Sequence, residues 1–213
     1  MLLKYLNAHH LPTAALVSLA LGLLPGSFSS AQAQSADIAG VRYPSTLNVE
    51  GTPLVLNGSG ISYNAVAKVY TVALYLPRKS DNTETVLSQE GPKQLRFVML
   101  KSTRVDELGR IITSGIESNN PREDFFRLIP AIQRMGEQFS HIQRLSAGDS
   151  FVIEWVPKRG TVFTVNEQPV GLPIADPGFF TSVLRVWLGK APRSPDLKTA
   201  LLDYHAPVLN VLD

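Results

Sequence analysis

Four polar residues are spaced at even intervals through a segment of strand-forming residues, 58–77 (GSGISYNAVAKVYTVALYLP). These residues are Ser62, Asn64, Lys68 and Tyr70. Because alternate side chains of a β-strand share a face, we expect the four to lie on one side of the sheet. Such a face suits a ligand with an apolar body and one anionic or phenolic end, with Lys68 supplying charge and Tyr70 a hydroxyl group. The alternative is a partly solvated face whose lysine points to water.

Arg104 is a further candidate for a binding site. It stands before a run of apolar residues at helical spacing between positions 105 and 116, and Thr103 with Asp106 is typical of a helix start. The dipole of a helix does not favour a cation at this end, so the position of the arginine hints at a role in binding. A solvated surface role is the alternative.

Other kinds of active site find little support in the composition. The chain has no cysteine, which excludes thiol catalysis and thiolate metal ligands. Outside the N-terminal segment only His141 and His205 remain, far apart and without a carboxylate at metal-ligand spacing. No Gly-x-Ser-x-Gly sequence is present. We therefore expect no metal and no cofactor, and we assign no catalytic residue.

The N-terminal segment has the layout of a secretory signal peptide. Lys4 precedes an uncharged apolar stretch at residues 11–24, and Ala31-Gln32-Ala33 is a small-x-small cleavage site. We predict a signal peptide at residues 1–33, cleavage after Ala33 and a single domain at 34–213 in the periplasm or outside the cell. The apolar stretch is short for a bilayer span, so a retained membrane anchor is the less favoured alternative.

Charge is spread evenly along the chain of 213 residues. Twenty Lys and Arg residues stand against eighteen Asp and Glu residues, with a formal net charge of +2 and no long run of one sign. Nucleic-acid binding and an anionic-membrane anchor are therefore poorly supported. We expect a small apolar or amphipathic ligand as the partner, while a protein partner stays open.

The order of secondary structure indicates an α+β domain. We expect an irregular lead-in followed by a short strand within residues 34–50, then a short strand at 52–56 that leads into a turn at 57–60. The segment described above follows as one or two strands. The later elements follow from alternating or helical apolar spacing. Strands are expected at 94–100, 151–156 and 161–165, and helices at about 105–116, 121–139, 178–188 and 195–201. Asn120-Pro121 is expected to start the second helix, as its cap and first residue, and Pro130 is expected to kink or interrupt that helix. Strands followed by helices, twice over, favour an antiparallel sheet with helices packed on one face.

Trp155 and Trp187 are expected to be core residues.

Several stretches of the sequence resemble the chalcone isomerase fold family, and in particular its secreted bacterial branch. They are LNGSGISY followed by KVYTVALYL, then VNEQPVG at 165–171, and FFTSVLRVWLGKAPRSPDLKTALL at 179–202. Together they span about residues 38–204. The resemblance implies an open-faced β-sandwich, in which a large antiparallel sheet carries a layer of helices on one face.

The resemblance also implies a pocket but not the catalytic set of the family. Plant members close chalcones to flavanones without a cofactor, using an arginine whose position is occupied here by Ser62. A serine hydroxyl does not replace the fixed positive charge of a guanidinium. Tyr70 stands where those enzymes carry a threonine, and Asn119 loosely resembles their helix asparagine. Val186 and Trp187 fall at pocket positions of the last helix.

Other members of the fold bind fatty acids without catalysis, through an arginine and a tyrosine. We therefore predict a non-catalytic binder of a fatty acid, a phenolic compound or a tetrapyrrole, with Lys68 or Arg104 available for a carboxylate. The candidate ligand-binding residues are Ser62, Asn64, Lys68, Tyr70, Arg104, Asn119, Val186 and Trp187. One alternative is an isomerase or intramolecular lyase that uses Lys68, Tyr70 and Arg104. Another alternative is a protein whose pocket has collapsed and whose surface binds a protein partner.

Overall fold

A computed structural model describes residues 35–202. The predicted signal peptide lies outside these residues, and its cleavage after Ala33 stays a prediction. None of the helices within 35–202 is both long and apolar enough to cross a membrane.

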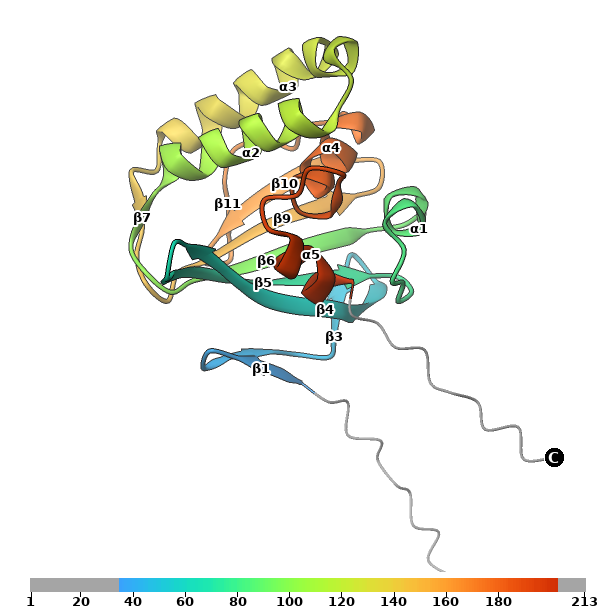
Figure 1. The fold of residues 1–213 in the computed structure, drawn as a ribbon. Coiled ribbons are helices and arrows are strands. Elements are labelled where there is room, and N and C mark those ends of the chain that lie inside the picture. Colours follow the sequence, from blue (N-terminus) through green and yellow to red (C-terminus); the bar gives the residue numbers. More distant parts are fainter. Residues whose placement is uncertain (1–34, 203–213) are drawn as a thin grey trace, which may run out of the picture. The chain divides into compact units, whose positions relative to one another are not determined.

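A curled, seven-stranded antiparallel sheet forms the framework of the domain (Figure 1). Its strands lie in the order β11-β10-β9-β6-β5-β4-β3. Their bounds are β3 Thr46–Val49, β4 Thr52–Asn64, β5 Ala67–Leu76, β6 Lys93–Met99, β9 Ser150–Val156, β10 Gly160–Val165 and β11 Gln168–Pro169. Two small ribbons complete the strands, β1 (Ala36–Ile38) with β2 (Val41–Tyr43) and β7 (Thr103–Arg104) with β8 (Arg144–Leu145).

A layer of helices packs on one face of this sheet, as Figure 1 shows. The helices are α1 Thr83–Ser88, α2 Val105–Asn119, α3 Arg122–Ser140, α4 Pro177–Leu188 and α5 Pro195–Leu201. The α+β class and the open-faced arrangement expected from the sequence are confirmed. The expected strands at 94–100, 151–156 and 161–165 and all four expected helices are present, with ends shifted by a few residues.

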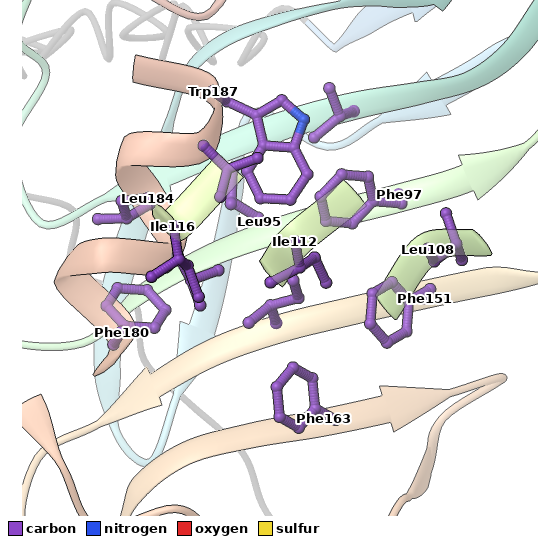
Figure 2. Close-up of a cluster of buried hydrophobic side chains, with 14 of the residues drawn as sticks. Leu95, Phe97, Leu108, Ile112, Ile116, Phe151, Phe163, Phe180, Leu184 and Trp187 are labelled. Carbon is purple, nitrogen blue, oxygen red and sulfur yellow. The ribbon is translucent and has the colours of Figure 1, made fainter. Parts of the chain in front are cut away.

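The main core lies between the sheet and helices α2 and α4 (Figure 2). Aromatic rings form its centre, with Phe151 and Phe163 stacked across neighbouring strands and Trp187 of α4 against Phe97 of β6. The ring centroids of this last pair are 5.1 Å apart. Leu108, Ile112 and Ile116, all from α2, cover the same rings. Their spacing of four residues places them on one side of the helix, which explains the apolar period of this segment.

A second, smaller core lies on the opposite face of the sheet. Tyr43 of β2 hydrogen-bonds to Thr71 with 2.7 Å between their oxygens, and the Tyr75 hydroxyl donates to the Pro44 carbonyl at 2.9 Å. Burial raises the pKa of Tyr43 to about 12. The segment expected as an irregular lead-in and one short strand thus contains three strands, and part of it packs against this face.

The strand expected at 52–56 is present, but the turn expected at 57–60 is wrong. Strand β4 runs through this segment, with a register shift between Leu56 and Gly58 against β5. Gly58 and Gly60 do not form a turn; they allow helix α5 to pack closely against β4. A Cβ atom at Gly58 would lie 2.3 Å from the Ala200 carbonyl oxygen, and one at Gly60 would lie 2.8 Å from a methyl group of Leu197. Helix α5 therefore rests directly on the backbone of β4.

Two further expectations about helices α2 and α3 need correction. Helix α3 continues without interruption through Pro130, whose ring is exposed on its outer side. Asn120 does not start α3; it ends α2, where its side-chain amide donates to the Ile116 carbonyl. Helix α2 begins at Val105 and has no side-chain cap, because its N-cap residue is Arg104, whose guanidinium cannot accept a hydrogen bond. The Thr103 hydroxyl donates to the Lys101 carbonyl.

Candidate functional site

Three of the predicted site residues meet inside the domain. The indole N–H of Trp187, on α4, donates to the hydroxyl of Tyr70, on β5, at 3.1 Å. Ser62, on β4, lies directly opposite Tyr70 in the strand pairing and is buried. The pair of Tyr70 and Trp187 also packs around Phe97, which meets the tyrosine ring edge-on. Tyr70, Trp187 and Ser62 thus place a small cluster of polar atoms within an otherwise apolar interior.

A small interior cavity borders this pair. Its volume is about 10 Å³, which is close to the size of one water molecule. Eight side chains line it: Tyr70, Phe97, Met99, Leu108, Ile111, Ile112, Phe151 and Trp187. None of them carries a charge, and the tyrosine hydroxyl and the indole N–H are their only hydrogen-bonding groups.

A much larger open groove runs along α2 and α3, with a volume of about 1310 Å³. Its apolar side chains include Ile132, Met135 and Phe139 of α3. Its charged side chains are Arg104, Asp106, Glu107, Arg110, Glu117, Arg144 and Arg193. Ile111 belongs to the lining of both the groove and the interior cavity. Its half-buried side chain therefore stands between the two spaces.

Asn64 and Lys68 do not lie in the interior. The segment that carries them is a hairpin, with Asn64 ending β4 and Lys68 near the start of β5, and both side chains are exposed. The turn between them includes Ala65, which has a φ of +52°. The expectation that Ser62, Asn64, Lys68 and Tyr70 share one face of one strand is wrong, because even spacing has no meaning across a turn.

Arg104 lies on the surface, at the end of the groove. Its guanidinium donates two hydrogen bonds to Asp106, from Nε at 2.9 Å and Nη2 at 2.8 Å. The hydrogen bond with Asp106 raises the pKa of Arg104, and it lowers the pKa of the Asp106 carboxyl. Arg110 reaches the same carboxylate at 3.4 Å. The acid thus offsets the unfavourable placement of a cation at the start of α2.

Asn119 and Val186 hold α2 against α4. The Asn119 amide donates to the Ala191 carbonyl at 2.8 Å, and its oxygen accepts from the Ala191 N–H at 2.8 Å. Val186 is buried against Gly115, where an added Cβ would lie 2.6 Å from a valine methyl group. Neither residue lines the interior cavity.

The sequence did not identify most of the cavity lining. The sequence predicted the strands that carry Phe97, Met99 and Phe151 and the helix that carries Leu108 and Ile112. Their apolar character predicted only that they are buried, and did not show that they line the same cavity. Asn120 was also missed as a link between helices. Its side-chain oxygen accepts hydrogen bonds from Ser182 at 3.0 Å and Arg185 at 2.7 Å.

Metal chemistry has no candidate site in the described part of the chain. No three His, Asp or Glu side chains gather between residues 35 and 202 in a group that could hold an ion.

We expect Tyr70→Phe to lower the free energy of unfolding by about 1–2 kcal/mol, because the buried Trp187 N–H loses its acceptor. The phenylalanine ring keeps the edge-on contact with Phe97. Urea denaturation measures the change. Tyr63→Phe is the matched control, because Tyr63 is 50% exposed and its change is expected within 0.5 kcal/mol. Equal stability of the two variants would show that the indole finds another acceptor.

Comparison with known proteins agrees with this architecture. The seven-stranded sheet, its single helical layer and the enclosed site beneath that layer define an α+β protein of the chalcone isomerase type. The model of the chalcone isomerase-like family matches residues 35–203, and the chain belongs to this family.

A solved structure is similar across most of the domain. It is the fatty-acid binding protein of Arabidopsis thaliana, with a TM-score of 0.65 and 12% sequence identity, and the match covers 80% of this chain and 96% of that chain. At this identity the likeness concerns the fold. No curated protein matches the sequence.

Proposed function

We propose that the protein is a non-catalytic binder of a small ligand with an apolar body and one polar end, acting in the periplasm or outside the cell. The observation that carries the proposal is the hydrogen-bonded pair of Tyr70 and Trp187 beside an otherwise apolar cavity. Ligand sites in proteins commonly combine apolar walls with a few placed polar groups. The fold shared with a plant fatty-acid binding protein supports the same class of ligand.

The charges favour a ligand that keeps its ionised end outside the interior. The cavity lining contains no cation. The family resemblance places Ser62 where other members carry an arginine. A carboxylate buried there would lack a partner and would be strongly disfavoured. Arginines line the groove on the other side of Ile111. We propose that the apolar body enters past Ile111 and that the polar end stays in this groove.

Binding requires the interior to open. A volume of about 10 Å³ is far below the 300–1,000 Å³ that ligand pockets usually have. We therefore propose that this is a closed state, and that a ligand selects a minor state in which Ile111 and neighbouring side chains of α2 have moved. The apparent affinity then falls with the fraction of molecules that are open.

The isomerase alternative has less support. Lys68 and Arg104 do not line the cavity that Tyr70 lines, and the guanidinium of Arg104 is bound to Asp106. Ser62 offers a neutral hydroxyl where charge stabilisation would be needed. Chalcone turnover above the uncatalysed rate, lost in Tyr70→Phe, would favour the enzyme over the binder.

Native mass spectrometry of protein purified from its producing cells without detergent tests the binder directly. We expect an added mass that is released on denaturation and that identifies the ligand. A ligand-free mass, together with no binding of added fatty acids or phenols, would overturn the proposal. The N-terminal residue of the same sample tests the predicted cleavage after Ala33.

Substitutions of Ile111 are expected to change affinity in opposite directions. Ile111→Ala removes the partition between groove and cavity and should tighten binding of cis-parinaric acid about tenfold, because more molecules are open. Ile111→Trp should weaken it at least tenfold by filling the entrance. Fluorescence titration measures both. Ile132→Ala is the control, because Ile132 lines the groove but not the cavity. Equal affinities in all four proteins would exclude entry at Ile111.

A further inference from the structure

One end of the domain brings together three segments that are distant in the sequence. The N–H groups of Leu100 and Lys101 donate to the Val69 carbonyl at 2.9 and 3.3 Å, which joins the loop after β6 to the β4–β5 hairpin. The ribbon of β7 and β8 follows directly, and Nη1 of Arg144 donates to the Ser102 hydroxyl at 3.2 Å. Figure 1 shows the hairpin turn and β7 at the same end of the sheet.

The tip of the hairpin is apolar and exposed. Val66 has 95% of its surface exposed and Tyr63 has 50%. Ala65 and Ala67 flank the valine and are also exposed. The turn places Ala65 at a φ of +52°, a conformation in which glycine, asparagine or aspartate is usual. The fold therefore does not require apolar residues here, and their presence needs another explanation.

Three cations that form no salt bridge among the described residues lie on the hairpin and on the segments beside it. Lys68, Lys101 and Arg144 are exposed, and no carboxylate of the described residues forms a salt bridge with any of them. Asp106 pairs with Arg104. Asp149 accepts hydrogen bonds only from neutral donors, the Ser146 N–H and the Asn166 amide, so it keeps its charge, but the three cations outnumber it. The end of the domain formed by Tyr63, Val66, Lys68, Lys101 and Arg144 is called the hairpin end below.

We propose that the hairpin end docks reversibly on an anionic phospholipid bilayer. Val66 would enter the boundary between head groups and acyl chains, and Tyr63 would lie at the interface with its hydroxyl in water. Lys68, Lys101 and Arg144 would face the negative surface potential of the lipid. The charges are complementary, and a bilayer needs no matching shape in its partner.

A protein partner fits the same surface less well. A stable protein interface buries about 800 Å² on each side around a central apolar cluster. Here only a narrow apolar turn is exposed, with separate cations beside it. Such a surface is too small for a stable protein interface but can insert into a fluid lipid bilayer. Arg104 and Arg144 also line the groove, so docking would bring the mouth of the groove to the lipid. The docking itself does not depend on ligand binding in the interior.

Sedimentation with vesicles tests the proposal, using protein purified from its producing cells. We expect binding to vesicles of equal parts phosphatidylglycerol and phosphatidylcholine, little binding to phosphatidylcholine alone, and a loss of binding as salt rises. The double variant K68Q/K101Q should bind about 30-fold more weakly. Val66→Ser should weaken binding several-fold at every salt concentration.

Matched controls separate docking from general effects. Leu172→Ser removes another exposed apolar side chain, and Lys190→Gln removes another exposed cation; both should bind as the unchanged protein does. Circular dichroism checks that each variant is folded. The proposal is overturned by failure to bind anionic vesicles, by equal binding to neutral ones, or by equal losses in variants and controls. An acidic protein as the true partner would give the first of these results.

Discussion

Asn57→Ala is expected to lower the free energy of unfolding by about 3–5 kcal/mol. Asn57 is 3% exposed and joins three parts of the chain. Its amide donates to the carbonyls of Ser80 and Leu201 at 2.9 and 2.8 Å, and its oxygen accepts from the Ser80 N–H at 2.7 Å. Alanine would leave three buried backbone groups without partners, each at a cost of about 1–3 kcal/mol. Urea denaturation followed by tryptophan fluorescence measures the loss.

Two comparisons make this test specific. Asn64→Ala, at the exposed hairpin turn, should change stability by less than 0.5 kcal/mol. Asn57→Asp should be at least as harmful as alanine, because a carboxylate would face two carbonyl oxygens where the amide donates. A loss below 1 kcal/mol in Asn57→Ala would mean that water replaces the side chain and that α5 is held to the sheet by other contacts.

Trp187→Ala is expected to cost about 3–5 kcal/mol and to enlarge the interior cavity. The indole is 3% exposed, packs against Phe97 and lines the cavity beside Tyr70. Truncating a buried aromatic residue loses its transfer free energy and leaves a space that the surroundings fill only in part. The new space would be largely apolar, and such cavities stay dry and bind small aromatic molecules.

Added indole therefore provides a second measurement on this variant. We expect indole to raise the melting temperature of Trp187→Ala with increasing concentration and to leave the unchanged protein unaffected. Trp155→Ala is the control, because Trp155 is only partly buried and does not line the cavity. Stabilisation of the control as well would indicate binding elsewhere. No stabilisation of Trp187→Ala would show that the helices collapse into the space.

The interior and the groove have different parts in the proposed function. The interior supplies apolar contact and the hydrogen-bonding pair of Tyr70 and Trp187, while the arginines remain in the groove at the surface. Their separation avoids the cost of burying an unpaired charge. In the proposed function, this separation would let a protein with a serine at position 62 bind an amphipathic molecule.

The sequence by itself determined the local elements of the domain. Strands 151–156 and 161–165 were predicted from alternation, and helix 178–188 from its apolar spacing and the glycine at its end. These patterns depend on neighbouring residues, whose periods differ between strand and helix. The order of these elements predicted the α+β architecture, the family resemblance agreed with it, and the structure confirms it.

Only the tertiary structure decided which residues come together. Tyr70 and Trp187 are distant in the sequence, and their hydrogen bond depends on where α4 crosses the sheet. The turn at Ala65 separated Lys68 from the interior, although the segment has a strand-like composition throughout. The role of Gly58 was also ambiguous in the sequence. A glycine that lets a helix pack closely cannot be distinguished there from a glycine that forms a turn.

The closed interior and the basic hairpin end were also beyond the sequence. A cavity is the small difference between the volume enclosed by the elements and the volume of the side chains, and composition does not determine it. Lys68, Lys101 and Arg144 form no run along the chain, and the pairing of strands brings them to one end. Contacts between distant segments thus decided where the proposed binding surfaces lie, because local patterns specify elements and not their neighbours.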